Sequence, residues 1–486
     1  MKIKVINKKY EEVKNLPSIK RKKPIKQSFI LSTLVRLISI PTFLSTRLKV
    51  EKVNMNKLNK KESYLALMNH SSFTDLKIIF KLLYPRRFNI VASEDAFVGQ
   101  EGLLRHLGCF ATKKFTTDPS LVRDMIYIAK KFKNPIVMYP EAGYTYDGTS
   151  TTLPDSLGKL IKLLKIPVVF IKTTGAFLRD PLYNNLQIRK VKIHTKMDCL
   201  LSKEEVEKLS VDEINNIVYK QFTFDELKYQ QENKIEINEP FRADKLNRIL
   251  YRCSSCGSEG FMEGKGITLT CHKCGKVHEL TPHGYLKALD GKETITHIPT
   301  WYQYERECVR KEIESGEYKI ESDVEVYLIK NYKAVYKVED AHLTHTKDGF
   351  HLKGINSSLD YHQNPLFSYC INSDFNWYEI GDVVCIGEKE LYYLVPKGNK
   401  DIVCKIRLAV EEMYKIHKEK IGKFTYFFVV EPKPPVLISS LSSSTTIPNG
   451  KKIPWENAIP LSIVKDLFSL ESLVNLVIIW PSFKAL

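Results

Sequence analysis

The chain has 486 residues, of which 43% are hydrophobic and 27% are charged. With a mean hydropathy of −0.24, this composition is typical of a globular protein with two or three domains and excludes a polytopic membrane protein. The net charge is +18, and residues 1–60 hold 16 Lys and Arg against three Asp and Glu, a net of +13. Such a basic N-terminus can bind nucleic acid or anionic lipid.

The first apolar stretch, Ser28–Leu44, favours lipid. It is short for a membrane-spanning helix, which needs ~20 apolar residues, and it contains Arg36 and Pro41. We expect no signal peptide here. Residues 1–45 are therefore interpreted as a basic leader and an interfacial amphipathic helix on an anionic membrane surface, at the cytoplasmic face; a buried or a spanning helix are the alternatives. Four cations precede the stretch: Arg21, Lys22, Lys23 and Lys26.

Residues 46–235 alternate short apolar runs with segments of helical periodicity. This alternation predicts an α/β domain with a mostly parallel sheet. A charged helical segment, Lys203–Glu232, ends it. The expected strands are Tyr64–Met68, Asn89–Ala92, Pro135–Tyr139, Pro167–Ile171 and Val191–His194, and the expected helices are Asp75–Leu83, Leu121–Phe132 and Leu157–Leu164.

Four cysteines form two Cys-x2-Cys pairs separated by 14 residues: Cys253, Cys256, Cys271 and Cys274. Four thiolates at this spacing predict one closed, structural zinc site in a zinc ribbon over residues 249–281. An iron–sulfur cluster or a rubredoxin-like iron uses the same ligands and is the alternative. His272 and His278 are interpreted as bystanders. The other six cysteines follow no disulfide pattern, which indicates a reducing cytosol.

In residues 300–420, a stretch rich in Tyr, Val and Ile, Tyr318–Pro396, lies between a helical segment, Trp301–Ser315, and an amphipathic helix, Asp401–Lys420. The pattern predicts a mostly β domain with a C-terminal helix, of pleckstrin-homology type. Residues 425–486 combine a Pro- and Ser-rich linker with an apolar tail, Val464–Trp480, whose role the sequence does not indicate.

A polar segment with catalytic potential, Asn69–Asp75, follows the predicted strand Tyr64–Met68 and opens a helix. His70 lies in the turn at the carboxyl end of the strand, and Asp75 lies in the first helical turn, so their side chains can meet. A neutral imidazole is the natural general base near pH 7, and a carboxylate fixes its tautomer. In the alternative interpretation, Asp75 completes a variant capping box with Ser72.

The order Asn-His-x4-Asp resembles the signature of the phospholipid/glycerol acyltransferase superfamily, which includes the 1-acylglycerol-3-phosphate acyltransferases. The resemblance covers about residues 35–235. With Asn69–Asp75 as the first block, three further blocks resemble the family's second, third and fourth motifs in the family's order: Gly108–Lys114 (GCFATKK), Tyr139–Gly143 (YPEAG) and Ile166–Val169 (IPVV). The residues that follow the third block, 144–152, are called the third-block loop. The chain to about residue 420 resembles a bacterial subgroup with an added zinc ribbon.

The resemblance implies transfer of an acyl group from acyl-CoA or acyl carrier protein to a lysophospholipid hydroxyl, most simply 1-acylglycerol-3-phosphate to phosphatidic acid. His70 would be the base and Asp75 would orient it. Five residues would hold the phosphate and glycerol of the acceptor: Thr112, Lys113, Lys114, Glu141 and Gly143. Glu141 would accept a hydrogen bond from a hydroxyl or position a lysine, and Gly143 would let the backbone approach a ligand.

One departure affects the acceptor. The family's third motif usually carries an Arg next to its Gly, and this chain has Tyr144 and Thr145 there. Phosphate recognition would then rest on Lys113 and Lys114, unless these lie in a solvated loop, or the acceptor is another lysolipid.

One other mechanism and two other functions are alternatives to this interpretation. Cys109 could be an acyl-enzyme nucleophile. The chain could also be a non-catalytic lipid-binding protein or a nucleic-acid-binding zinc-ribbon protein. The positive charge precedes an apolar helix and no basic and aromatic residues interleave around the four cysteines, so nucleic acid is disfavoured; the intact His70 and Asp75 disfavour a non-catalytic protein.

Overall fold

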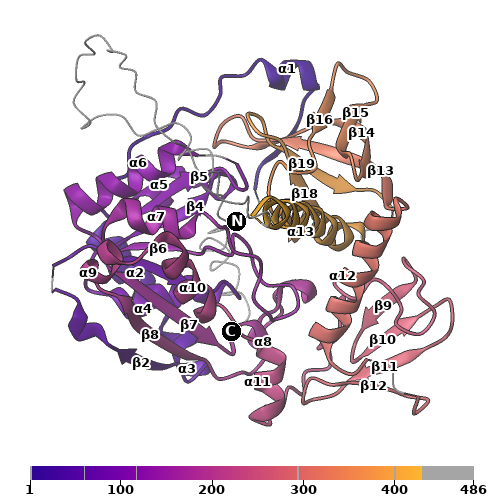
Figure 1. Cartoon of the computed structure of the whole chain (residues 1–486), viewed down its shortest axis with the longest axis horizontal. Helices are drawn as coiled ribbons and strands as arrows, with labels where there is room; N and C mark the ends of the chain where they lie inside the picture. The colour runs from indigo at the N-terminus through magenta and orange to yellow at the C-terminus, as the bar shows by residue number, and fades with distance from the viewer. Residues whose placement is uncertain (1–2, 60, 117, 293–294, 399–400, 430–486) are drawn as a thin grey trace, which may run out of the picture.

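The computed structural model describes residues 3–429 except positions 60, 117, 293–294 and 399–400. These residues form an α/β unit, a small cysteine-bearing β unit and a C-terminal sheet with two long helices (Figure 1). The predicted apolar tail lies outside the described residues, as does most of the predicted 425–486 linker.

The α/β unit is built on a seven-stranded sheet in the order β2-β8-β7-β3-β6-β4-β5. Its neighbouring strands are parallel except for the antiparallel pair β7–β8, so the predicted mostly parallel sheet is confirmed. The central strands β3 and β4 are buried at every position, as expected where helices cover both faces. The strands are β2 (Lys49–Val53), β3 (Leu65–Met68), β4 (Asn89–Ser93), β5 (Cys109–Thr112), β6 (Ile136–Met138), β7 (Val168–Thr174) and β8 (His194–Leu201).

The helices of this unit match the predicted ones closely. The predicted helix 121–132 changes at Ile128 into a π-helical turn that ends at Phe132. Ser202 and Ser210 each begin a helix with a capping box, which explains why the charged segment after β8 is helical. The helices are α4 (Thr74–Leu83), α5 (Glu101–His106), α6 (Pro119–Tyr127), α7 (Leu157–Leu164), α8 (Ala176–Arg179), α9 (Lys203–Lys208), α10 (Val211–Gln221) and α11 (Glu226–Glu232).

One predicted strand was misplaced. The predicted strand 191–194 overlaps β8 only at His194, because β8 begins there and runs to Leu201. In β8 buried and partly buried positions alternate. Its polar residues interrupt the apolar run by which a buried strand is recognised in a sequence. The strand β5 was also missed; it lies within the Gly108–Lys114 block, which was interpreted as a ligand-binding motif.

The N-terminal segment connects the C-terminal sheet to the α/β unit. Strand β1 (Val5–Asn7) pairs in parallel with β14 of the C-terminal sheet, and helix α1 (Tyr10–Lys14) packs beside it. Arg21 then binds Asp118 and Asp124 of the α/β unit. The leader is therefore part of the folded structure.

The predicted apolar helix 28–44 is broken at Ser39 into α2 (Phe29–Ile38) and α3 (Ile40–Ser45). Pro41 lies in the first turn of α3, where its missing N–H is tolerated. Within the described part of the chain, no helix combines the length and apolar character needed to cross a bilayer.

The cysteine unit is an antiparallel sheet in the order β12-β11-β10-β9. Its strands are β9 (Met262–Lys265), β10 (Thr268–Cys271), β11 (Val277–Leu280) and β12 (Leu286–Ala288), so the unit extends past the predicted end at residue 281. Helix α12 (Ile298–Ser315) leads from it to the C-terminal sheet (Figure 1).

The C-terminal region is mostly β, as predicted. Seven strands follow the order β16-β15-β14-β13-β19-β18-β17, all antiparallel, and helix α13 (Ile402–Val429) packs on β17, β18 and α12. The strands are β13 (Lys319–Leu328), β14 (Val335–Thr346), β15 (Gly349–Gly354), β16 (Asp360–Gln363), β17 (Asn372–Trp377), β18 (Gly381–Ile386) and β19 (Tyr392–Pro396).

Candidate active site and metal centre

The turn between β3 and α4 holds the predicted base. Strand β3 ends at Met68, and α4 begins at Thr74. Asn69 fixes the turn to β7, because its Nδ2 donates to Thr173 O at 2.9 Å and its Oδ1 accepts from Thr173 N at 2.8 Å. The turn therefore lies at the carboxyl ends of two parallel strands, where open α/β sheets carry their sites.

His70 and Asp75 meet as predicted. Their Nδ1 and Oδ2 atoms lie 3.0 Å apart, and the two residues are 3% and 0% exposed. The same Oδ2 accepts from the backbone N–H of Ser71 at 2.7 Å and of Ser72 at 3.1 Å. One carboxylate oxygen thus accepts hydrogen bonds from the backbone of the turn and also contacts the imidazole. Asp75 therefore has both a structural role in the turn and contact with His70.

The outer nitrogen of the ring is available for chemistry. His70 Nε2 is buried and has no hydrogen-bond partner among the described residues. We assign the ring proton to Nδ1, which donates it to Asp75. Nε2 then carries the lone pair that can accept a proton from a bound hydroxyl.

Two tyrosines enclose the imidazole. The ring centroids of Tyr139 and Tyr144 each lie 4.2 Å from that of His70. Both phenols are buried, and burial raises their pKa values, so they stay neutral. The pair excludes water from the ring. Both residues flank the Tyr139–Gly143 block, but their contact with His70 depends on the fold and leaves no local signal.

Glu141 ties the third block to the first. Its Oε2 accepts from His70 N at 3.0 Å and its Oε1 accepts from Thr151 N at 3.0 Å. A hydroxyl also donates to this carboxylate, since Thr151 Oγ1 lies 3.4 Å from Glu141 Oε1. Burial raises the pKa of Glu141 to about 7. The left-handed backbone position of the block is Ala142, with φ of 60°, rather than Gly143.

The second block contacts the C-terminal sheet. Lys114 is buried, and its Nζ donates to Asn372 Oδ1 at 3.0 Å; Lys113 Nζ donates to Lys389 O at 2.8 Å. Thr112 Oγ1 donates to Asp118 at 3.1 Å. The solvated loop is therefore not observed. Cys109 is buried and burial raises the pKa of its thiol, which disfavours a nucleophilic thiolate.

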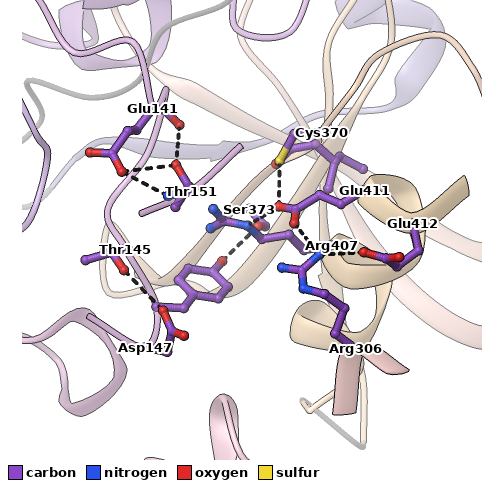
Figure 2. A network of polar contacts seen from close by, with 12 residues as sticks. Glu141, Thr145, Asp147, Thr151, Arg306, Cys370, Ser373, Arg407, Glu411 and Glu412 are labelled. Atoms are coloured by element: carbon purple, nitrogen blue, oxygen red, sulfur yellow. Dashed lines mark hydrogen bonds and ion pairs between the residues drawn. The ribbon is translucent and has the colours of Figure 1, made fainter. Parts of the chain in front are cut away.

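The C-terminal sheet closes over the third block. Tyr146 Oη lies 2.7 Å from Ser373 Oγ, and the Tyr146 ring stacks on Phe375 with a centroid distance of 4.6 Å. Trp377 Nε1 donates to Asp95 Oδ2 at 3.2 Å. Figure 2 shows residues of the third-block loop beside α12 and α13. Sequence reasoning missed these contacts, which join residues more than 200 positions apart.

The four cysteines form one cluster whose sulfur atoms all lie within 4.8 Å of one another. Cys253 and Cys274 Sγ are 3.7 Å apart, and Cys256 and Cys271 Sγ are 3.8 Å apart. A tetrahedral zinc with Zn–S bonds of about 2.3 Å requires sulfur separations of about 3.8 Å. The cluster therefore fits a structural zinc, and His272 and His278 lie outside it.

Each cysteine pair is followed by a glycine that the knuckle requires. Gly257 and Gly275 have φ of 71° and 75°, in the left-handed region that favours glycine. Their N–H groups donate to the carbonyls of Cys253 and Cys271 at 2.9 and 2.8 Å, which folds each knuckle back around the metal position.

The family comparison covers the part of the chain that holds His70 and Asp75. Residues 49–172 match the model of the family described as Acyltransferase. This match supports the resemblance of residues 49–172 to the phospholipid/glycerol acyltransferase superfamily. Among solved structures, the chain is similar to the 1-acyl-sn-glycerophosphate (LPA) acyltransferase PlsC from Thermotoga maritima, with 16% identity, a TM-score of 0.30, and coverage of 40% of this chain and 80% of that one. The search of curated proteins found no match.

Proposed function

We propose that the protein transfers a fatty acyl group from acyl-CoA or acyl carrier protein to the hydroxyl of a lysophospholipid, with 1-acylglycerol-3-phosphate as the first candidate. The observation that carries the proposal is the buried His70–Asp75 pair inside a domain of the acyltransferase family. The acceptor is proposed to lie along the second and third blocks, which hold Thr112, Lys113, Lys114, Glu141 and Gly143. The absence of an Arg beside Gly143 favours another lysolipid as the second candidate.

In this mechanism His70 Nε2 removes the proton of the acceptor hydroxyl as its oxygen attacks the thioester carbonyl carbon. The new C–O bond forms, the C–S bond breaks, and His70 returns the proton to the leaving thiolate. Asp75 stabilises the imidazolium between the two steps. General-base catalysis of this kind contributes about 10²–10⁴-fold.

We also propose that the protein binds the cytoplasmic membrane surface peripherally. The helices α2 and α3 expose apolar side chains, with Ile30 79% and Leu44 72% exposed. Exposed apolar residues on short helices after a basic segment are typical of interfacial binding to anionic lipid. Six cysteines of the described structure lie outside the proposed zinc site and form no disulfide there, which suits a reducing compartment. The remaining exposed residues of this surface are Phe29, Leu34, Leu37 and Ile40.

Two structural assignments belong to the same proposal. The C-terminal sheet is proposed to be pleckstrin-homology-like; its seven strands pair in the order 4-3-2-1-7-6-5 and a helix follows. The cysteine unit is proposed to be a zinc ribbon with one structural zinc, supported by its two knuckles on an antiparallel sheet.

Product analysis by mass spectrometry tests the function. The protein and its His70→Ala variant are incubated with lysophosphatidate or other lysolipids and with either acyl donor. A diacyl product that is lost in His70→Ala is expected. His297→Ala is the matched control, because His297 Nε2 also pairs with a carboxylate, Asp225 at 2.9 Å, away from the turn. Equal product from wild type and His70→Ala would refute the mechanism.

A further inference from the structure

A polar cavity of about 370 Å³ lies between the third-block loop and the helices α12 and α13. Thr151 lines it on the loop side, and Arg306 and Arg407 line it on the helix side (Figure 2). Thr151 N also donates to Glu141, which accepts from His70 N. One buried side chain therefore connects the wall of the cavity to the backbone of the proposed base.

Arg407 is held in a fixed orientation in this cavity. It is 5% exposed, and its guanidinium lies over the Tyr146 ring, 4.2 Å from the centroid. Its Nε donates to Glu411 Oε1 at 3.2 Å, which fixes the plane of the guanidinium. Within the described part of the chain, no acceptor is bonded to its two terminal amino groups. A guanidinium held in this way presents a rigid fork of donors, the geometry that binds phosphate in a bidentate manner.

Two further cations and two carboxylates line the cavity around Arg407. Arg306 and Lys415 also line it, and the opposing carboxylates are Asp147 and Glu411. Burial disfavours the charge of Glu411, but Arg306 and Arg407 outweigh burial and lower its pKa to about 2, so it is ionised. Asp147 is already bonded to Thr149 N at 3.0 Å.

A third carboxylate, that of Glu412, lies behind the wall of this cavity. Glu412 pairs with Arg306 at 3.0 Å and with Lys415 at 2.8 Å. Arg306 and Lys415 are thus largely neutralised by carboxylates. Arg407 shares one oxygen of Glu411 and keeps the capacity to bind a further anion.

We propose that this cavity binds the phosphate monoester of a substrate, with Arg407 as the bidentate donor and Lys415 at the rim. The identity of the substrate that carries the phosphate depends on the proposed function, whereas phosphate binding in this cavity does not. Two sources carry this chemistry: the glycerol phosphate headgroup of a lysolipid acceptor and the ribose 3′-phosphate of a coenzyme A donor. In either case a residue of the C-terminal region would complete the site of the acyltransferase domain.

The test is calorimetric binding of glycerol 3-phosphate, coenzyme A and dephospho-coenzyme A to the full chain. Arg407→Lys keeps the charge but loses the fork, and it should weaken binding by about tenfold to hundredfold. Lys415→Gln, at the partly exposed rim, should weaken it by about two- to fivefold and is not expected to disturb the fold. Lys311→Gln is the matched control for Lys415→Gln, since Lys311 is exposed on α12 and lies outside the cavity lining.

The three ligands separate the sources. Arg407-dependent binding of glycerol 3-phosphate identifies the headgroup, and Arg407-dependent preference for coenzyme A over dephospho-coenzyme A identifies the donor. Either result supports the site even if no acyl transfer is detected, in which case only the proposed function fails. Equal affinities in wild type, Arg407→Lys and Lys415→Gln, or binding of none of the three ligands by wild type, would overturn the site while leaving the proposed function untouched.

Discussion

Replacing Asp75 by Asn separates the two tasks of this carboxylate. Asp75 Oδ2 holds His70 Nδ1 and two backbone N–H groups, while Oδ1 is buried without a partner in the described structure. The amide of Asn can place its oxygen at Oδ2 and its NH2 group at Oδ1, so the turn keeps its acceptor. What is lost is the negative charge that stabilises the imidazolium.

The expected result is a large loss of rate with a small loss of stability. Turnover in Asp75→Asn should fall by about 10²–10⁴-fold, and the free energy of unfolding should fall by no more than about 1–2 kcal/mol. The assays are steady-state kinetics with the lysolipid that yields product and urea unfolding followed by circular dichroism.

Asp225→Asn is the matched control. Asp225 also caps a helix, accepting from Lys228 N at 2.8 Å, and also binds a histidine ring, that of His297. The control should show a similar loss of stability and an unchanged rate. If Asp75→Asn retains wild-type turnover, the assignment of Asp75 as the orienting carboxylate is wrong.

Three further results are expected. Cys256→Ser should reduce the zinc content from one ion per chain to none by metal analysis and unfold β9–β12, since metal binding and folding are coupled in such units; a full metal content would refute the ligand set. Because the folded-state pKa of Glu141 is raised from 4.5 to about 7, its contribution to stability is complete below about pH 4.5 and is lost as pH rises through about 7. Urea unfolding from pH 5 to 8 should show this fall, and Glu141→Gln should flatten it. Trp377→Leu removes the bond to Asp95 and the stacking on Tyr393, and should lower the unfolding free energy by about 2–4 kcal/mol; an unchanged value would show that this contact does not stabilise the fold.

The part of the site that local sequence determines was predictable. The segment from β3 through His70 to α4 is a short apolar strand, a polar turn and an amphipathic helix, and each carries its own pattern. The two cysteine knuckles are equally local, because ligand spacing and the following glycines fix them.

The remainder depends on contacts between distant residues. Tyr139 and Tyr144 lie within a few residues of Glu141, but nothing in their sequence indicates that they enclose His70. Strand β1 has three residues and forms only because β14 offers a partner more than 300 positions away. Arg407 is one of several cations on α13, and only the packing of α13 brings it to Tyr146.

The closure of the C-terminal sheet over the second block leads to a last prediction. Lys113 and Lys114 bond Lys389 O and Asn372 Oδ1, yet the proposed function places an acceptor along them, as the alternative to a headgroup phosphate bound at Arg407. If an acceptor takes these lysines, it must weaken the contact with β17, and by linkage a tighter contact must weaken acceptor binding. Hydrogen exchange at the backbone N–H groups of β17 should therefore quicken when lysolipid is added to the His70→Ala variant, in which turnover is prevented. Asn372→Ala should lower the KM for the acceptor without changing that for the acyl donor. Unchanged exchange together with an unchanged KM would mean that the two lysines serve only to dock the C-terminal sheet, and that acceptor phosphate is bound elsewhere.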